Sequence, residues 1–470
     1  MKIRATRSFT LAHQMSFAQA SGDWNPLHVD PVYARRLPNG RPLVHGIHTF
    51  LWALDLALKD VSGRHLLTAA RVSFPSALRV DQTVDLLATV SEGDVTIEAT
   101  ADSDPVLQAH LTITATNGEA PAPSYKEVAR TVPDAHLFEE LETVAGSRDL
   151  TITAEAAKLF PKVLSCLNAE DFALLLQLSA TVGMDSPGLN SIFSSFRVER
   201  KPAASEGEGP LRFSPRRIDE RFGKVDLALE TPHHSGQLTA FYRPERRRQA
   251  AFTTVLEQVE TGEFRNQRAL IVGGSRGLGE VFAKTVAAGG GDVAVTYRSG
   301  AGDALAVVAE IGGADRKAQA LRFDVLEREA WPRPFSHGPP THVYYLATPP
   351  IFVGSRTQYS RRLEQEFAEY YVEALSRAAQ SYLDCSPLCI IAPSSIAVTE
   401  VPLGMEEYAN AKEAQEVWAR DWMAEHRHHR VVCDRYPRLA TDQTQSNALG
   451  GALDPLEFVL ERVREANTAL

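Results

Sequence analysis

One stretch of the sequence constrains the fold of the second half of the chain. RALIV (268–272) has the composition of a buried strand, and the glycine-rich GGSRGLGE (273–280) follows it directly and opens a helix. Further strand-like segments alternate with helical ones: DVAVTYRS, LRFDV, HVYYLAT and LCIIAPSS. This alternation predicts an α/β, Rossmann-type doubly wound parallel sheet over residues 265–470.

The first half of the chain has a different order of predicted helices and strands. In residues 1–120 a helical segment, IHTFLWALDLALKD, precedes alternating strand-like segments with turn residues between them. Residues 121–250 repeat this order without obvious sequence identity, starting from LNAEDFALLLQLSATVG. A helix followed by antiparallel strands, twice over, predicts an α+β internal duplication, and GEAPAPSYKE (118–127) reads as the linker.

Composition excludes several classes of function. The net charge of −10 argues against a nucleic-acid partner, and no apolar stretch approaches the ~20 residues that span a membrane.

The N-terminus lacks the apolar core of a signal peptide, so we expect a cytoplasmic protein. The four cysteines lack metal-ligand spacing, so no metal is expected: Cys166, Cys385, Cys389 and Cys433. RPERRRQ (243–249) reads as a solvated surface run, with phosphate binding toward a carrier arm or coenzyme A as the alternative.

A first set of chemical groups lies between residues 23 and 46. Asp23 and His28 are close in sequence, and a carboxylate and an imidazole can share one catalytic water. Gly46 is placed where a helix begins, so its free N–H can stabilise a growing negative charge. Without further context, the same residues would read as a polar turn in which Asp23 caps a helix.

The complete string resembles the MaoC-like, or (R)-specific, enoyl-CoA hydratase family. The matching residues are Ser21, Gly22, Asp23, Asn25, Pro26, Leu27 and His28, with His45–Gly46 at the helix start. The resemblance implies a hot-dog fold in which Asp23 and His28 are the catalytic dyad, Asn25 orients them and Gly46 binds the thioester oxygen. Residues 121–250 carry no such dyad, so the resemblance implies a double hot-dog with a degenerate second repeat that completes the fold and holds the acyl chain.

The glycine loop of the second half has a specific spacing. Gly273 permits the tight turn, Gly277 lets the backbone approach a pyrophosphate, and Gly279 lets the helix pack on the strand. The spacing Gly-x-x-x-Gly-x-Gly resembles the short-chain dehydrogenase/reductase family. The expected cofactor-binding residues are Gly273, Ser275, Arg276, Gly277, Leu278, Gly279, Arg298, Asp324, Val325, Ala347, Pro437 and Thr441.

The choice of cofactor is predicted from the end of the second strand. An NAD-preferring site would place Asp or Glu there, but the sequence has Tyr297-Arg298-Ser299, and the loop adds Arg276. Two cations without a carboxylate favour a 2′-phosphate and therefore NADPH. The alternative is that both arginines are ordinary surface residues. By the resemblance, Asp324 contacts adenine.

The resemblance also implies a catalytic set of Ser395, Tyr408 and Lys412, with Ser394 as the alternative serine. Tyr408 and Lys412 share one helical face, so the ammonium is expected to lower the pKa of the phenol that protonates a carbonyl. RYPRLATD is similar to the family's Pro-Gly-x-x-x-Thr segment, with Arg438 in place of glycine.

Two further segments depart from the family pattern. LATPP (346–350) stands where the family has Asn-Asn-Ala-Gly. EFAEYYVEAL (366–375) offers tyrosines where the family often has an asparagine in the helix before the serine strand. These departures concern the proton relay and the substrate pocket.

Both resemblances concern neighbouring steps of one pathway. They imply a bifunctional NADPH-dependent 3-oxoacyl-thioester reductase and (R)-3-hydroxyacyl-thioester dehydratase/enoyl hydratase of fatty-acid or polyketide-like biosynthesis. The expected partners are an acyl thioester of coenzyme A or of acyl carrier protein and, through the reductase domain, a second copy of the chain in a homodimer. Two alternatives stay open: only the hot-dog dehydratase is active beside a vestigial reductase domain, or the chain is a non-catalytic acyl-carrier-binding scaffold.

Overall fold

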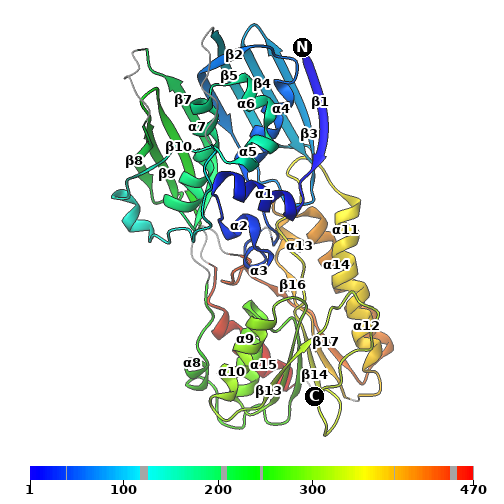
Figure 1. Cartoon of the computed structure of the whole chain (residues 1–470). Helices are drawn as coiled ribbons and strands as arrows, with labels where there is room; N and C mark the ends of the chain where they lie inside the picture. Colours follow the sequence, from blue (N-terminus) through cyan, green and yellow to red (C-terminus); the bar gives the residue numbers. More distant parts are fainter. Residues whose placement is uncertain are drawn as a thin grey trace. The chain divides into compact units, whose positions relative to one another are not determined.

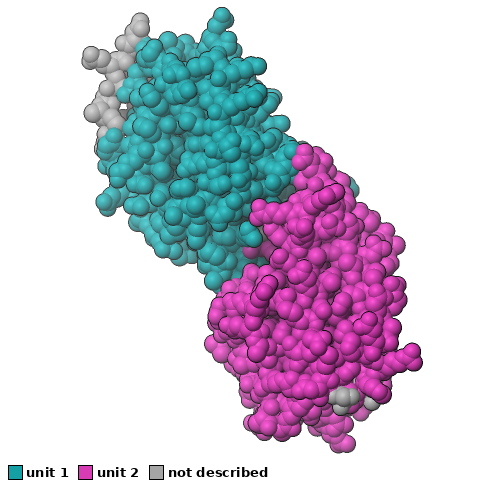
Figure 2. All heavy atoms as spheres, turned by 90° about the vertical axis from the view of Figure 1, so that its right-hand side faces the viewer, with its two compact units in different colours: residues 1–35, 41–245, 446–449 teal, residues 36–40, 246–445, 450–470 magenta. Residues whose placement is uncertain are grey.

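A computed structural model gives the fold of two compact units, coloured separately in Figure 2. Unit 1 comprises the described residues of 1–35 and 41–245, and unit 2 those of 36–40, 246–445 and 450–470. The structure describes residues 1–38, 40–116, 125–202, 209–243, 247–385, 387–444 and 452–468. Most of the expected linker (118–124) and the centre of the arginine-rich run (244–246) lie outside the described residues.

Unit 1 contains one ten-stranded sheet in which all neighbouring strands pair antiparallel. The strand order is β1-β3-β4-β5-β2-β7-β10-β9-β8-β6, and the two repeats join where β2 pairs with β7. The strands of the first repeat are β1 (Lys2–Ser8), β2 (Arg64–Ser73), β3 (Thr83–Ser91), β4 (Asp94–Ala101) and β5 (Asp104–Thr116). The strands of the second are β6 (Gly146–Arg148), β7 (Ser191–Arg200), β8 (Leu211–Asp219), β9 (Lys224–Glu230) and β10 (His234–Tyr242).

One long helix per repeat covers the sheet of unit 1. Helix α4 (Gly46–Ala57) packs on β3, β4 and β5 and also contacts α7 (Ala169–Ala180) (Figure 1). Both helices are buried almost all round, which is why their sequences are apolar on every face. The shorter helices are α1 (Leu11–Ser21), α2 (Pro26–Val29), α3 (Pro31–Ala34), η1 (Phe138–Glu142), α5 (Ala154–Leu159), α6 (Pro161–Cys166) and η2 (Thr181–Asp185). The predicted double hot-dog is therefore confirmed.

Unit 2 contains a six-stranded parallel sheet with the order β13-β12-β11-β14-β15-β17. Numbered along the sheet's own strands this is 3-2-1-4-5-6, the doubly wound order whose switch point lies between the first and fourth strands. The strands are β11 (Arg268–Val272), β12 (Asp292–Tyr297), β13 (Ala318–Arg322), β14 (His342–Tyr345), β15 (Cys389–Ile391) and β17 (Arg430–Val432). A small parallel pair, β16 (Ser394–Ser395) and β18 (Arg435–Tyr436), extends beyond the ends of β15 and β17. The predicted Rossmann-type sheet is confirmed.

Helices cover both faces of this sheet and form a hydrophobic core on each. One face carries α8 (Phe252–Leu256), α9 (Gly277–Ala288), α10 (Ala301–Gly312) and α15 (Pro455–Asn467). The other carries α11 (Arg361–Ala368), η3 (Glu369–Glu373), α12 (Ala374–Ser381), α13 (Ala397–Glu400) and α14 (Glu406–Glu425). Among the described residues no helix is both long and apolar enough to span a bilayer, and the four cysteines are free thiols.

Candidate active sites

The loop that carries Asp23 and His28 is shaped by local sequence rules. Helix α1 ends at Gly22, which adopts the left-handed conformation (φ +78°) that glycine tolerates best. Asn25 then caps α2 by accepting a hydrogen bond of 3.0 Å from the Leu27 N–H, and Pro26 occupies the first helical turn. Asp23 and His28 therefore lie on either side of one tight turn.

The Asp23 carboxylate is buried against the second repeat. The Ser179 hydroxyl, at the end of α7, donates to Asp23 Oδ2 at 2.7 Å, and the Asn25 N–H donates to Oδ1 at 3.2 Å. A Cβ on Gly183 in η2 would lie 2.3 Å from Asp23 Oδ1, so glycine is required there. Burial raises the pKa of Asp23, and the neighbouring His28 and Ser179 oppose the rise. Ser179 and Gly183 of the degenerate repeat therefore line one side of the site.

Asn25 also binds the second repeat. Its Nδ2 donates to the carbonyl oxygens of Gly183 at 2.9 Å and Gly188 at 3.1 Å. The sequence predicted that Asn25 orients the dyad. In the structure it holds the backbone of the loop, and the orientation of the two side chains follows from that.

His28 points toward the same space as Asp23. Its Nδ1 lies 2.8 Å from the Leu43 carbonyl oxygen, which can only accept, so Nδ1 carries the proton and Nε2 keeps a free lone pair. Burial lowers the pKa of His28, while the charge of Asp23 opposes this. His28 is therefore neutral at pH 7 and can act as a proton acceptor.

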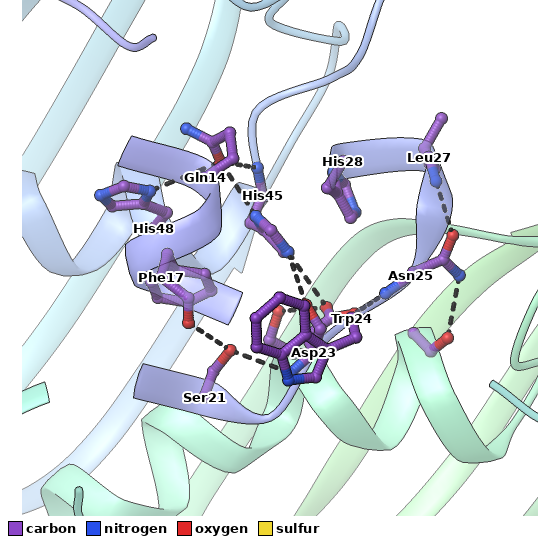
Figure 3. Close-up of polar contacts among 12 residues, drawn as sticks. Gln14, Phe17, Ser21, Asp23, Trp24, Asn25, Leu27, His28, His45 and His48 are labelled. Atoms are coloured by element: carbon purple, nitrogen blue, oxygen red, sulfur yellow. Dashed lines mark hydrogen bonds and ion pairs between the residues drawn. The ribbon is translucent and has the colours of Figure 1, made fainter. Parts of the chain in front are cut away.

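His45 also belongs to this site, although the sequence predicted no role for its side chain. Its ring stacks on His28 with a centroid distance of 3.8 Å and an angle of 25°. Its Nε2 lies 3.1 Å from the Asp23 carbonyl oxygen, and its Nδ1 lies 2.9 Å from Gln14 Oε1 (Figure 3). The only sequence signal was its position directly before Gly46. The donor atoms of Asp23, His28 and His45 all lie within 4.8 Å of one another, so the group could hold a divalent ion.

Gly46 starts α4 as the sequence predicted. His45 is the N-cap and makes no side-chain cap hydrogen bond, so the first N–H groups of the helix are available for a ligand. A Cβ on Gly46 would lie 3.0 Å from three atoms of the Phe74 ring. Glycine therefore lets an aromatic ring lie directly on the helix start.

The second repeat carries different side chains at the corresponding positions. Pro161 begins α6 as Pro26 begins α2. At the offsets of Asp23 and His28 from their proline, the second repeat has Lys158 and Val163.

In unit 2, the glycine loop connects β11 to α9 as the sequence predicted. Gly273 has φ +84°, and a Cβ there would lie 2.9 Å from the Ala347 nitrogen. A Cβ on Gly279 would lie 2.2 Å from the Gly273 carbonyl oxygen. At Gly277 (φ +57°) it would lie in ordinary van der Waals contact with Thr441, 3.7 Å away. The close approaches at Gly273 and Gly279 therefore require glycine at these two positions.

The two arginines expected to bind a 2′-phosphate already have protein partners. Arg276 Nη1 lies 2.6 Å from Asp442 Oδ2. Arg298 Nη1 donates to the Tyr370 hydroxyl at 2.7 Å, and its Nε lies 3.9 Å from Asp324 Oδ2. The end of β12 carries no carboxylate, as the sequence predicted, but Asp442 and Asp324 reach the two arginines from other segments. The choice between NADPH and NADH stays a prediction.

The remaining predicted cofactor residues lie in or beside the switch point. Ser275 is buried in the glycine loop, Leu278 packs on the adjacent core, and Val325 is buried after β13. Pro437 is separated from Thr441 by three residues, one fewer than in the family's Pro-Gly-x-x-x-Thr pattern.

The predicted catalytic side chains of unit 2 do converge. Tyr408 and Lys412 lie one turn apart on α14, and the Tyr408 phenol hydrogen-bonds Ser395 on β16. Ser394, the alternative serine, donates to Glu416 Oε1 at 2.5 Å and is engaged elsewhere.

Lys412 differs from expectation. Burial raises the pKa of Tyr408, and the hydrogen bond from Ser395 opposes the rise. The direction is opposite to the lowering that the sequence predicted. Lys412 Nζ donates to the Pro393 carbonyl at 2.7 Å and to Gln415 Oε1 at 2.9 Å, and burial lowers its own pKa to about 7.

Comparison with known families gives one match in each unit. The model of the MaoC like domain matches residues 1–104, and that of the short chain dehydrogenase matches residues 267–337. The chain joins a MaoC-like domain to a short-chain dehydrogenase domain. The glycine loop, Arg298 and Asp324 fall inside the second match, whereas Ser395, Tyr408 and Lys412 lie beyond it.

Individual relatives match short parts of this MaoC-like and short-chain dehydrogenase chain. The (R)-specific enoyl-CoA hydratase of Aeromonas caviae is 44% identical over 46 residues, 10% of this chain and 34% of the relative. The peroxisomal multifunctional enzyme type 2 of Mus musculus is 31% identical over 80 residues, 17% of this chain and 11% of the relative. The chain thus matches about a third or less of these two curated relatives. A solved short chain dehydrogenase from Burkholderia cenocepacia in complex with NADP is 25% identical, with a TM-score of 0.39, covering 44% of this chain and 91% of that one.

Proposed function

We propose that this chain interconverts 3-oxoacyl, 3-hydroxyacyl and 2-enoyl thioesters, with an NADPH-dependent reductase in the second half and an (R)-specific dehydratase/hydratase in the first. The observation that carries the proposal is the convergence of Asp23 and His28 beside the start of α4 at Gly46. The domain division 1–120, 121–250 and 265–470 is part of this proposal.

The hydration step follows from the protonation states at the first site. The thioester oxygen accepts a hydrogen bond from the Gly46 N–H, where the helix dipole favours the developing charge. The free Nε2 of His28 takes a proton from the water that attacks carbon 3. Asp23, whose pKa burial raises, delivers a proton to carbon 2. Dehydration runs the same steps in reverse.

The reduction step uses the residues around Tyr408. A nicotinamide cofactor bound at the glycine loop would supply the hydride for carbon 3 of the 3-oxo group. The Ser395 hydroxyl holds the carbonyl oxygen, and the Tyr408 phenol donates the proton to it. Arg276 and Arg298 favour a 2′-phosphate, but only if its charge displaces Asp442 and Asp324 as their partners.

A narrower function is supported by one observation. The Lys412 ammonium is engaged by Pro393 and Gln415. If these contacts persist when the cofactor binds, the reductase is vestigial and only the MaoC-like domain turns over. The scaffold alternative requires that neither domain is catalytically active. The homodimer, the carrier (coenzyme A or acyl carrier protein), the biosynthetic role and the cytoplasmic location stay predictions.

Two separate assays test the proposal. Loss of the enoyl absorbance of crotonyl-CoA measures the hydratase activity of the MaoC-like domain. NADPH oxidation with acetoacetyl-CoA measures the reductase activity of the dehydrogenase domain. We expect Asp23→Asn to abolish only the first activity and Tyr408→Phe only the second. Absence of both activities in the wild-type chain, with coenzyme A and acyl-carrier substrates alike, would contradict the proposal.

A further inference from the structure

The helix that passes Lys412 carries a tyrosine where the related family often has an asparagine. Residues 369–373 form a π-helical turn, η3, between α11 and α12. Such turns are frequent at functional sites because they displace side chains from the regular helical positions. Tyr371 lies in this turn and is 2% exposed.

The face of the Tyr371 ring contacts the Lys412 ammonium. Lys412 Nζ lies 3.8 Å from the ring centroid. An ammonium has three N–H groups, and the other two acceptors are the Pro393 carbonyl at 2.7 Å and Gln415 Oε1 at 2.9 Å. The aromatic face therefore takes the third position around the buried cation, where a cation–π contact is stronger than at a surface.

The Tyr371 ring is itself fixed from two sides. Its hydroxyl lies 2.5 Å from Thr348 Oγ1, and Thr348 donates onward to the Pro349 carbonyl at 3.1 Å, so Tyr371 donates to Thr348. Its ring meets the Tyr408 ring edge-on, with centroids 5.7 Å apart and planes at 77°. Thr348 belongs to LATPP and Tyr371 to EFAEYYVEAL, so the two departures from the family pattern contact each other.

We propose that Tyr371 is a positioning residue of the reductase site, whose ring holds the Lys412 ammonium beside Tyr408 while Thr348 holds the ring. This rests on the proposed reductase function. The pair Tyr371–Thr348 would replace the asparagine that the sequence lacks. Thr348→Val should weaken reduction less than loss of the ring, because the ring remains packed against Tyr408.

The Tyr371 ring also affects the protonation of Lys412. Burial lowers its pKa to about 7, while Cys433 and Glu416 favour the charged form. The aromatic face of Tyr371 also favours that form, and Tyr408 completes the surroundings as a neutral phenol. Removing the ring electrons should therefore lower the pKa of Lys412 by about half to one pH unit.

The test compares two rings of the same shape in the full chain. Tyr371→Phe keeps the aromatic face, whereas pentafluorophenylalanine incorporated at position 371 reverses its electrostatic sign. The chain carries ¹³Cε-lysine, Lys412 is assigned by the signal missing from Lys412→Met, and its titration is followed by NMR. We expect Tyr371→Phe to titrate like the wild type and the fluorinated ring to titrate at lower pH. The pH at which NADPH oxidation is lost should shift in the same direction.

Equal Lys412 titrations in the two ring variants would overturn the proposal, and so would equal pH profiles of reduction. Tyr371→Leu provides a second comparison, with thermal unfolding as the check that the domain remains folded. If the wild type oxidises no NADPH, the proposed reductase function fails. The NMR titration still reports whether the ring stabilises the ammonium, so the two failures are distinguishable.

Discussion

Ser179 of the second repeat donates a hydrogen bond of 2.7 Å to the Asp23 carboxylate of the first repeat. The two residues are 156 positions apart and meet because the hot-dog repeats share one sheet through β2 and β7. The second repeat carries no such dyad at the compared positions, yet it positions Asp23 of the first repeat, which leads to the first two predictions.

Ser179→Ala should slow hydration of crotonyl-CoA by roughly two- to tenfold, because a hydrogen bond between uncharged groups is worth about 0.5–1.5 kcal/mol and this one positions the Asp23 carboxyl. Steady-state kinetics measure the loss. Ser165→Ala, an exposed serine of the same repeat, should leave the rate unchanged. Equal rates for the two variants would show that Ser179 does not position the carboxylate.

Gly183→Ala should reduce hydration about a hundredfold, since the new Cβ would lie 2.3 Å from Asp23 Oδ1 and displace the carboxylate. NADPH oxidation by the other domain should be retained. Gly302→Ala is the matched control, because a Cβ there meets nothing within 4 Å. A fully active Gly183→Ala chain would show that Gly183 does not lie against the Asp23 carboxylate.

The rate of hydration should fall on the acid side with a midpoint below pH 6.5. His28 must be neutral to accept a proton, and burial lowers its pKa from the ordinary value of 6.5. The neutral fraction of His28 is therefore complete above that value and falls as the pH drops through the lowered pKa, whereas the protonated Asp23 that the mechanism needs sets a separate loss of rate on the alkaline side. A profile of kcat against pH measures this, and an acid midpoint above 6.5 would exclude His28 as the base in the assigned environment.

Asp442→Asn should tighten NADPH binding roughly fivefold, equivalent to about 1 kcal/mol. The substitution removes a carboxylate 2.6 Å from Arg276 and leaves the guanidinium available to a phosphate. Fluorescence titration with NADPH measures the dissociation constant, with Asp421→Asn on the exposed face of α14 as control. Weaker binding by Asp442→Asn would mean that Arg276 needs this acid for its position.

Local sequence patterns predicted what depends on neighbouring residues. The turn around Asp23, the helix start at Gly46 and the glycine loop are each set within a few positions, and the structure has them as expected. The alternation of elements likewise predicted both folds, because hydrophobic periodicity and order determine a sheet's class.

The missed features depend on residues that are distant in sequence. Ser179 and Gly183 reach Asp23 only through the shared sheet, and Asp442 reaches Arg276 from the far end of the dehydrogenase domain. Helical spacing placed Tyr408 and Lys412 on one face but could not reveal that Pro393 and Gln415 hold the ammonium. Such tertiary partners determine pKa values, which is why the expected lowering at Tyr408 was wrong.

Mass analysis of the products formed from acetoacetyl-CoA and NADPH by the wild type and by Asp23→Asn tests directly whether the two domains act in sequence. We expect both chains to consume NADPH, the wild type to form both 3-hydroxybutyryl-CoA and crotonyl-CoA, and Asp23→Asn to stop at the hydroxy product. Crotonyl-CoA formation by Asp23→Asn at the wild-type rate, or no NADPH consumption by the wild type, would contradict the proposed function.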